Sequence, residues 1–485
     1  MKLIIEARFE DSDVQAGPAI VVGEIQRQEG NLIDLGLTLV EGRDLLGQVQ
    51  SRMVSQQAQR WLELHSGCHR CGQALADKDT RSVIVRTVFG KIAVPSPRWW
   101  SCRCGKEGRR HTFSPLCKAL TRRTTLELEC LQAKWAAHLP YRQANSLLKE
   151  VLPLHKAMSF VGTRRRVLAV GQRLDQLVQH DIAQHRDRAS ASASIEPRES
   201  KDVACVAVDS AWLTLYVSPK SRQAQQAEEK LHPLRMKQVW AHHVNIVAGR
   251  ATFARRPARL YGYVHKEVDS AADRLDQFLC AGGVRTAERV TVISDDAGEF
   301  VKAVRGSELA RGRILDWFHI AMKFKAAQNS VRGSKLFEPH ERDMVCDWLR
   351  RAEWLVWHGK GRQAVARIKG MDEELLARPG HEDSTLWWNL RRLYYYIDNN
   401  ESTLVNYGAR YRKGLPISSS IAESAVNLLV SHRMAKKQQM RWTNEGAHQL
   451  VQVRVAALNG ELTPKRLAAL SKMNSANASQ TRQVA

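Results

Sequence analysis

The sequence predicts an α/β fold whose sheet domain contains an all-helical insertion and follows a cysteine-containing, helical N-terminal region. Three observations lead to this prediction. Between residues 203 and 318, short runs rich in β-branched side chains alternate with helical patterns. Residues 320–415 show no strand pattern but hold five tryptophans, which indicates helices. Two closely spaced cysteine pairs lie between residues 68 and 104 and flank a predicted hairpin.

The size and charge of the chain limit its class of partner. The chain has 485 residues, of which 44% are hydrophobic, enough for roughly three domains of about 150 residues. Lys and Arg number 74 against 50 Asp and Glu, a net charge of +24. This excess favours polyanionic partners over neutral small molecules, so nucleic acid is the first partner to test. A solvated basic surface is the alternative interpretation.

Cysteine usage and hydropathy indicate the compartment. The nine cysteines are an odd number with few close spacings, which makes a disulfide framework a poor interpretation. The N-terminal apolar run is too short for a signal peptide, and no stretch approaches the ~18 apolar residues of a membrane helix. We therefore expect a soluble, cytoplasmic protein.

The N-terminal region is expected to consist of a helical segment and a hairpin. Residues 1–66 are assigned to the helical segment, because apolar side chains recur at helical intervals in residues 36–65. Two β-rich runs then surround Phe89-Gly90-Lys91 and predict a hairpin within residues 67–113.

The cysteine pairs beside this hairpin predict a structural zinc site of the zinc-ribbon type. Four thiolates can hold Zn²⁺ tetrahedrally and close its coordination shell. The second pair is spaced more tightly than the usual C-x-x-C, so ordinary reduced cysteines are the alternative, and His69 or His111 can substitute for one thiol. The four predicted zinc ligands are Cys68, Cys71, Cys102 and Cys104.

Residues 114–180 are predicted to form a helix-turn-helix-like, DNA-binding region. Their pattern is helical, and residues 163–166 open the second helix of the motif. That helix is the candidate for reading bases in the major groove, with a solvated basic helix as the alternative. Residues 181–202 are polar and rich in Ser, Ala and Arg, a composition typical of a linker.

The sheet domain is expected to begin at residue 203. Its first part is assigned to residues 203–330, the helical insertion to 331–415, a C-terminal helical region to 416–460 and a tail to 461–485. The tryptophans of the insertion are expected in its core, with stacking on exposed bases as the alternative. Strands are predicted at 203–208, 212–217, 239–247, 289–294 and 313–318, and helices at 267–280 and 297–305.

Three of these apolar runs finish on aspartate, a residue that is depleted within strands. They end at Asp209, at Asp295 with Asp296, and at Asp316. Strand ends of an α/β sheet gather ligands, and carboxylates there suit Mg²⁺. Two such ions, about 3.5 to 4 Å apart, can activate an attacking hydroxyl and stabilise a leaving oxygen in phosphoryl transfer. The alternative is that each aspartate is a turn or helix-cap residue.

Glu423 is a further carboxylate with two interpretations. Ser420 and Glu423 have the S-x-x-E spacing of a capping box, which begins a helix. The first turn of a helix also gives a metal ligand a defined direction. Spacing alone therefore does not separate the two roles.

The segments around these carboxylates resemble bacterial insertion-sequence transposases of the DDE type, in particular the Kra-type group. The matching elements are VAVDSAW, VISDDAGEF, LDWFHIAMKF and the tail that begins SSSIAESAVNLL. The resemblance covers about residues 60–460, and the tail is its most specific part. The matching tail positions are Glu423, Asn427, Arg433, Lys437, Trp442, Gly446, Ala447, Arg454, Asn459 and Gly460.

The resemblance implies an RNase H-like catalytic core in which Asp209, Asp295 and Glu423 hold two Mg²⁺ or Mn²⁺ ions. The family usually has glycine after the second aspartate, where this chain has Asp296. Asp316 with His319 resembles the family's Cys/Asp-x-x-His element, in which the histidine contacts phosphate or organises the site. A buried, hydrogen-bonded histidine is the alternative.

The resemblance also implies a reaction and its partners. Such enzymes cut DNA at transposon ends and join the freed 3′-hydroxyl to target DNA. Terminal inverted repeats and target DNA are the expected partners, bound by a homodimer or larger assembly at the nucleoid. A catalytically inactive DNA-binding regulator and an RNase H-fold nuclease without strand transfer are the alternatives. DNA contacts are predicted at Arg164, Arg165, Arg166, Arg433, Lys436, Lys437 and Trp442.

Overall fold

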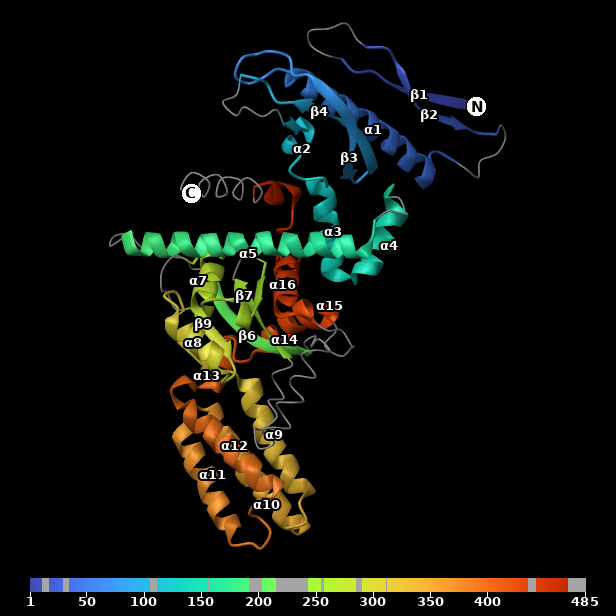
Figure 1. Ribbon diagram of the computed structural model, residues 1–485. Coiled ribbons are helices and arrows are strands. Elements are labelled where there is room, and N and C mark those ends of the chain that lie inside the picture. The colour runs from blue at the N-terminus through green and yellow to red at the C-terminus, as the bar shows by residue number, and fades with distance from the viewer. Residues whose placement is uncertain are drawn as a thin grey trace, which may run out of the picture. The chain divides into compact units, whose positions relative to one another are not determined.

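The computed structural model divides the chain into two compact units (Figure 1). The first unit comprises Met1–Val170 together with Leu462–Ala485, and the second comprises Gly171–Glu461. The structure describes residues 1–10, 17–28, 35–104, 111–154, 158–191, 203–214, 243–253, 257–284, 290–310, 312–434 and 442–469.

The first unit begins with a two-stranded hairpin and a long helix. Strands β1 (Lys2–Ala7) and β2 (Ile20–Gln26) pair antiparallel, and helix α1 spans Leu39–Leu64. The helical prediction is therefore wrong for the two strands, whose β-branched runs favour extended backbone. The helix expected within residues 36–65 is present, and Thr38 and Glu41 form a capping box at its start.

A second hairpin follows, with its turn where the sequence predicted it. Thr87 pairs with Gly90 across the turn, and Gly90 has φ of 125°, which side chains other than glycine rarely adopt. The elements of this region are β3 (Asp77–Thr87), β4 (Gly90–Trp100), β5 (Thr112–Phe113) and α2 (Pro115–Ala119).

Three helices pack around a buried polar network in the first unit. Thr163 donates a hydrogen bond to Asn145 (3.2 Å) and accepts one from Gln132 (3.4 Å). The second and third helices lie where the two-helix motif was predicted, with Thr163 near the start of the third. The helices are α3 (Leu126–His138), α4 (Tyr141–Val151) and α5 (Phe160–Ala191), and the boundary between the two units falls within α5.

Helix α5 extends into the predicted linker. Residues 181–191 are helical, so the linker prediction at 181–202 is wrong for this part. Polar side chains hold this end of the helix in the second unit: Asp181 accepts a hydrogen bond from Gln277 (3.3 Å), and Arg186 forms an ion pair with Asp273. Residues 192–202 lie outside the described residues.

The second unit contains a mixed five-stranded sheet. The strand order is β10-β9-β6-β7-β8; β6, β9 and β10 are parallel, while β7 runs antiparallel to β6 and β8. A single long β6 replaces the two strands predicted at 203–208 and 212–217, and β8 was not predicted. The strands are β6 (Val203–Thr214), β7 (His243–Phe253), β8 (Arg259–Val264), β9 (Thr291–Ser294) and β10 (Gly312–Leu315).

Helices α7 (Ala271–Ala281) and α8 (Gly298–Gly306) share an apolar core with the sheet. Phe278 of α7 and Phe300 of α8 pack there with Val206 and Val208 of β6. A short 3₁₀ turn, η2 (His265–Glu267), follows β8. The helices predicted at 267–280 and 297–305 are thus present within a few residues of their expected bounds.

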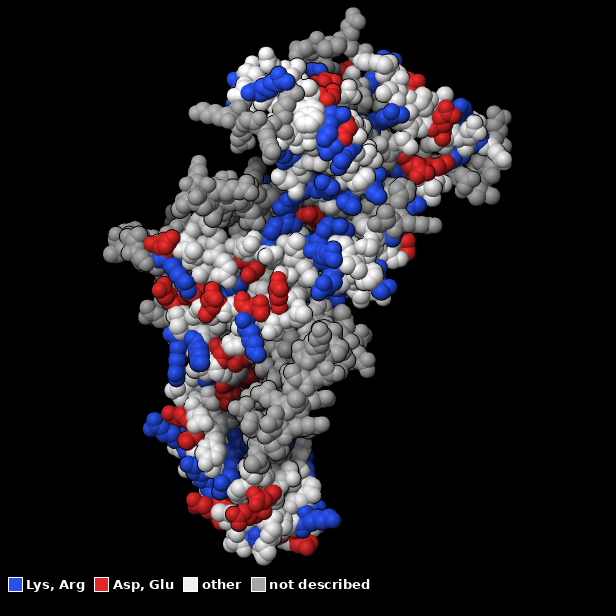
Figure 2. All heavy atoms as spheres, in the orientation of Figure 1, with Lys and Arg blue, Asp and Glu red and all other residues white. Residues whose placement is uncertain are grey.

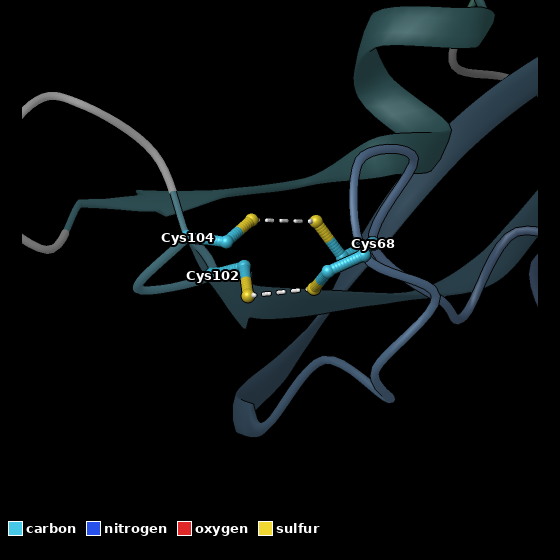
Figure 3. A group of neighbouring side chains, drawn as sticks. Cys68, Cys102 and Cys104 are labelled. Atoms are coloured by element: carbon cyan, nitrogen blue, oxygen red, sulfur yellow. Dashed lines mark hydrogen bonds between the residues drawn. The ribbon is translucent and has the colours of Figure 1, made fainter.

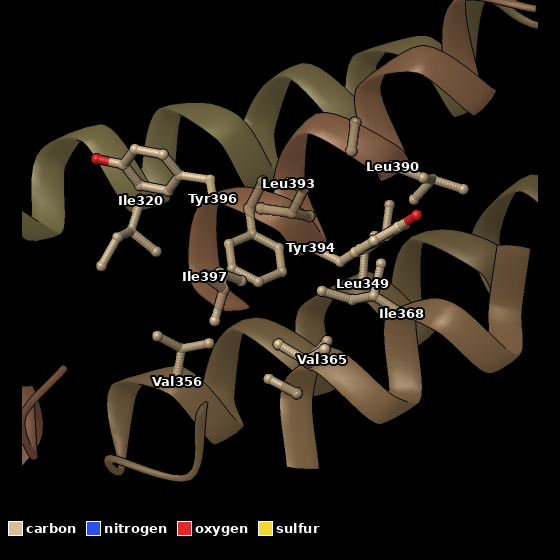
Figure 4. Close-up of a cluster of buried hydrophobic side chains, with 14 of the residues drawn as sticks. Ile320, Leu349, Val356, Val365, Ile368, Leu390, Leu393, Tyr394, Tyr396 and Ile397 are labelled. Atoms are coloured by element: carbon tan, nitrogen blue, oxygen red, sulfur yellow. The ribbon is translucent and has the colours of Figure 1, made fainter. Parts of the chain in front are cut away.

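A helical insertion follows β10, and its helices bury an apolar core (Figure 4). The same cluster includes Ile293 of β9 and Ile314 of β10, so this core is continuous with the sheet. Leu349, Ile368 and Leu390 come from three of its helices and join Ile293 of β9 in one buried cluster. Trp387 is buried, whereas Trp354 and Trp388 are about half exposed, so the core prediction for the tryptophans holds only in part. The elements are α9 (Trp317–Gly333), α10 (Pro339–Trp357), α11 (Gly361–Leu376), α12 (Thr385–Asn399), η3 (Glu401–Thr403) and α13 (Tyr407–Arg412).

The C-terminal helical stretch is interrupted rather than continuous. Helix α14 (Ser420–Val426) runs into a π-helical turn, η4 (Asn427–Ser431), and then into α15 (His432–Met434). Helix α16 spans Asn444–Leu458. Helices α14 and α16 pack against strands of the sheet. None of the helices in the described ranges is both long and apolar enough to cross a membrane.

Helices α5 and α16 approach closely at Gly171 within the second unit. A Cβ atom added to Gly171 would lie 2.1 Å from the carbonyl oxygen of Gln449, which is backbone and cannot rotate away. We predict that Gly171→Ala forces the helices apart and destabilises the second unit by about 1–3 kcal/mol. Gly370→Ala is the matched control, because nothing lies within 4 Å of a Cβ there. This control should gain up to about 1 kcal/mol from helix propensity. Thermal unfolding of both variants checks this, and equal melting temperatures would contradict the close approach.

Candidate functional site

The two cysteine pairs approach one another beside the β3–β4 hairpin (Figure 3). Sγ of Cys68 lies 3.5 Å from Sγ of Cys104, and Sγ of Cys71 lies 3.5 Å from Sγ of Cys102. All four sulfurs lie within 4.8 Å of one another. A tetrahedral zinc ion with Zn–S distances of about 2.3 Å separates its sulfurs by about 3.8 Å. The four cysteines can therefore hold a structural metal such as zinc.

Backbone hydrogen bonds favour the thiolate form of Cys68, whereas the neighbouring thiols disfavour that of Cys104. The N–H groups of Arg70 and Cys71 lower the pKa of Cys68 to about 6, whereas the hydrogen bond with Cys68 is the main cause that raises the pKa of Cys104 to about 12. A divalent ion displaces the protons that such crowded thiols share. His69 and His111 are not members of the group of ligand atoms, so neither substitutes for a thiol.

Three aspartates lie in a row across adjacent parallel strands of the second unit. The register of β6 and β9 places Asp209 level with Asp295, two residues beyond the pair Ala207 and Ile293. The register of β9 and β10 places Asp295 level with Asp316. Because side chains alternate along a strand, the three carboxylates point to the same face of the sheet.

Asp209 lies within a strand and not at its end. Strand β6 continues to Thr214, because residues 211–214 pair with the start of β7. The expectation that Asp209 terminates a strand is therefore wrong. The carboxylate is half-buried, and its Oδ1 accepts a hydrogen bond from the N–H of Ser210 (2.7 Å).

Asp295 and Asp296 occupy different environments. Asp295 is half-buried and its Oδ1 accepts a hydrogen bond from the N–H of Ala297 (3.1 Å). Burial raises the pKa of Asp295, and the charges of Asp209 and Asp296 add to this, while Ala297 and His319 act in the opposite direction. Asp296 is exposed. Of the two neighbours, Asp295 is thus the one that faces Asp209.

Asp316 is fully buried and saturated with hydrogen bonds. Its Oδ1 accepts from the N–H groups of Phe318 (2.9 Å) and Ser419 (2.8 Å), and its Oδ2 accepts from the hydroxyl of Ser419. Nδ1 of His319 donates to the same Oδ2 at 2.6 Å. Burial opposes ionisation, but the bonds from His319, Ser419 and Phe318 outweigh it and lower the pKa of Asp316. Asp316 is a cap and an organiser of neighbouring groups.

Helix α14 carries Glu423 over the face of the sheet that holds the aspartates. Arg250, the register partner of Ala207 on β6, donates a hydrogen bond to the hydroxyl of Ser424 (3.2 Å). The capping-box interpretation of Glu423 is wrong, because Ser419 is the N-cap of α14 and no side chain caps it. The Glu423 side chain is exposed. It is therefore not committed to holding the start of its own helix.

The predicted carboxylates are spread wider than one ion can bridge. Among the described residues, only the cysteine cluster brings three or more potential ligand atoms within 4.8 Å of one another. Asp209, Asp295 and Glu423 thus do not form a single closed site. Two Mg²⁺ ions about 4 Å apart, each with Mg–O distances of about 2.1 Å, are held by ligands spread over roughly 8 Å.

The predicted DNA contacts fall into four groups. Arg164 and Arg165 are exposed, and Figure 2 shows Lys and Arg gathered over the helices of the first unit. Arg166 is half-buried and donates to Gln132 at 2.7 Å. Arg433 and Trp442 are buried, and the indole of Trp442 donates to the carbonyl of Met434 (3.2 Å). Lys436 and Lys437 lie outside the described residues. Burial favours a packing role for this pair.

Sequence reasoning missed several residues that position the site. Ser419 joins Asp316 to the start of α14, and Arg313 donates to the carbonyl of Asp295 (2.6 Å) and to Asn400 (2.6 Å). Ser419 is the middle residue of a run of three serines, and the S-x-x-E spacing pointed to its neighbour Ser420 instead. Arg313 follows the strand pattern of its neighbours. Both partners become visible only when distant segments are brought together.

No protein-family model matches the chain, and no curated protein matches it either. The geometry of the site therefore carries the functional argument.

The pair of His319 and Asp316 predicts a pH dependence. The hydrogen bond from His319 to Asp316 raises the pKa of His319 above 6.5, although burial acts against it. A histidine whose folded pKa is raised stabilises the protein fully below its unfolded pKa of about 6.5, and this contribution is lost as pH rises through the folded value. Titration of His319 by NMR should give a pKa above 6.5 in the wild type and a lower one in Asp316→Asn. A wild-type value at or below 6.5 would exclude the charged pair.

Proposed function

We propose that this protein is a metal-dependent transposase of an insertion sequence, with Asp209, Asp295 and Glu423 as the ligands of two Mg²⁺ ions. The observation that carries the proposal is the parallel register that sets Asp209 beside Asp295 on one face of the sheet. Helix α14, which bears Glu423, lies over that same face through the contact of Arg250 with Ser424. The RNase H-like core that the resemblance implies requires such a mixed sheet with acidic residues on adjacent strands.

The chemistry of the donor set fits hard divalent cations. Asp209 and Asp295 offer carboxylate oxygens, which Mg²⁺ and Mn²⁺ prefer. Burial and the charge of Asp209 raise the pKa of Asp295, and a cation between the two would remove this repulsion. When bound, two ions supply charge for the attacking hydroxyl and for the leaving 3′-oxygen in phosphoryl transfer. Asp296, exposed and one residue farther along, is a bystander in this arrangement.

His319 is suited to a phosphate of the bound DNA. Its Nδ1 is fixed by Asp316, its pKa is raised by that contact, and its ring is about one quarter exposed. A protonated imidazole held in this way offers its Nε2–H to a phosphate oxygen. Asp316 acts through His319 and through Ser419, and does not itself bind a metal.

The first unit is suited to holding DNA. The net charge of +24 and the exposed Arg164 and Arg165 at the start of α5 favour a polyanionic partner. We infer that zinc occupies the cluster of four cysteines and stiffens the hairpin beside these helices. Terminal repeats and target DNA are the partners of the proposed reaction, with two copies of the chain pairing two ends.

Labelled end DNA with Mg²⁺ tests the reaction. We predict that Asp209→Asn and Glu423→Gln each lower strand cleavage by about 100-fold or more, because each replaces a negatively charged carboxylate ligand with a neutral amide. Binding of the end DNA should stay near the wild-type level. Asp296→Asn is the matched control and should retain cleavage within about threefold.

The products separate the three candidate functions. Joined products with the wild-type chain support transposition, whereas cleavage without joining favours a nuclease. Binding without cleavage would favour a regulator and contradict the proposal. An equal loss of cleavage in Asp209→Asn and Asp296→Asn would contradict the assignment of Asp295, and not Asp296, as the metal ligand.

Metal content tests the zinc cluster separately. The purified chain should hold one zinc ion, and Cys104→Ser should lose it together with part of the thermal stability of the first unit. Cys117→Ser is the matched control, because Cys117 is exposed and lies outside the cluster. Atomic absorption measures both variants. Full zinc occupancy in Cys104→Ser would show that the four thiols do not act together.

A further inference from the structure

The π-helical turn directly after α14 is held by an arginine from another helix. The N–H of His432 reaches back to the carbonyl of Asn427, the five-residue spacing of a π-turn. Nε of Arg454 donates to the carbonyl oxygen of Leu429 at 2.6 Å, and a terminal nitrogen of the same guanidinium donates to that of Leu428. Arg454 belongs to α16, so the turn depends on a residue more than 20 positions away.

Arg454 is an unusual residue to bury. Its side chain is about 2% exposed, and within the described residues its Nη1 has no hydrogen-bond partner. Burial, followed by the charge of Arg433, lowers the pKa of Arg454 to about 9. A buried guanidinium costs several kcal/mol unless its surroundings compensate. Hydrogen bonds to two carbonyl oxygens offset only part of this desolvation cost. If packing were the only role of this position, an apolar residue of similar size would fill it at lower cost.

The turn lies next to the segment that presents Glu423. Helix α14 is fixed at its start by the contact of Ser419 with Asp316 and near its middle by the contact of Ser424 with Arg250. Arg454 fixes its end. A π-turn holds one residue more than an α-turn, and each residue of an α-helix turns the chain by about 100°. Relaxation of the π-turn to α-helix would therefore rotate α14, and Glu423 with it, relative to the buried Met434 that follows the turn, and so would strain the contacts that orient Glu423.

We propose that Arg454 is a positioning residue for Glu423: by donating to the carbonyls of Leu428 and Leu429 it maintains the π-turn and so the direction of α14. This inference rests on the proposed function, because it takes Glu423 as a metal ligand. Arg454 touches neither metal nor DNA. Its effect reaches the site through the orientation of one carboxylate.

Mn²⁺ affinity of the full chain tests the proposal without requiring DNA or turnover. We expect Arg454→Lys to weaken Mn²⁺ binding by about 10-fold, the size of effect seen when a residue that orients a ligand is changed. A lysine can reach one carbonyl but not both. Arg454→Met, which removes the buried charge and both donors, should weaken binding further. Paramagnetic resonance of free Mn²⁺ gives the affinities, and thermal unfolding gives the stability of each variant.

Arg274→Lys is the matched control for a buried arginine. Arg274 is about 4% exposed, lies on α7 and forms an ion pair with Asp175, away from α14. It should lose stability while keeping wild-type Mn²⁺ affinity. If Arg454→Lys and Arg454→Met fold and bind Mn²⁺ as tightly as the wild type, Arg454 is a packing residue and the inference is overturned.

A further variant separates the inference from the proposed function. Asp209→Asn should abolish the same Mn²⁺ binding. Wild-type Mn²⁺ binding that Asp209→Asn leaves unchanged would contradict the proposed function itself, and with it any positioning role. Binding that depends on Asp209 but not on Arg454 would contradict the positioning role alone.

Discussion

The carboxylate of Asp316 is the contact on which the geometry of the second unit depends. It is fully buried at the end of β10 and accepts hydrogen bonds from Phe318, His319 and both donors of Ser419. These bonds join the end of β10 and the start of α9, which are neighbours in the sequence, to the start of α14, about 100 residues later in the chain. A buried carboxylate is tolerated only when it is so completely paired, and loss of its partners leaves a charge that costs several kcal/mol. The contact therefore fixes where Glu423 lies relative to the sheet.

The same contact explains how like charges coexist in a small space. Asp209 and Asp295 lie side by side, and the pKa of Asp295 is raised by burial and by its acidic neighbours. The imidazole of His319 offsets part of this repulsion and is itself held by Asp316. Arg313, bound to the carbonyl of Asp295, supplies another positive charge. Under the proposed function, these charges leave Asp209 and Asp295 free to bind a divalent cation, and the net positive charge of the chain suits a polyanionic partner.

Patterns of local sequence predicted much of this structure, and distant contacts account for the rest. The β3–β4 hairpin, the four-cysteine cluster and the helical insertion follow from turn residues, spacing and periodicity. Asp209 was assigned to a strand end because aspartate is rare within strands, yet pairing with β7 carries the strand past it. The N-terminal strands were missed because their two short apolar runs fit the periodicity of an α-helix as well as that of a β-strand. The capping box predicted at Ser420 is absent, because the N-cap of α14 is Ser419, whose N–H donates to Asp316, about 100 residues earlier in the chain. The π-turn has no local signal at all, since Arg454 completes it from another helix.

The central claim is that Asp209, Asp295 and Glu423 share one pair of divalent ions. Crystals grown with Mn²⁺ test it most directly, because anomalous scattering locates the metal without reference to activity. The account predicts two peaks about 4 Å apart, each within about 2.3 Å of a carboxylate oxygen of Asp209 or Asp295, with Glu423 bound to at least one. Peaks at Asp296 or on the exposed acidic surface, with none between Asp209 and Asp295, would contradict it.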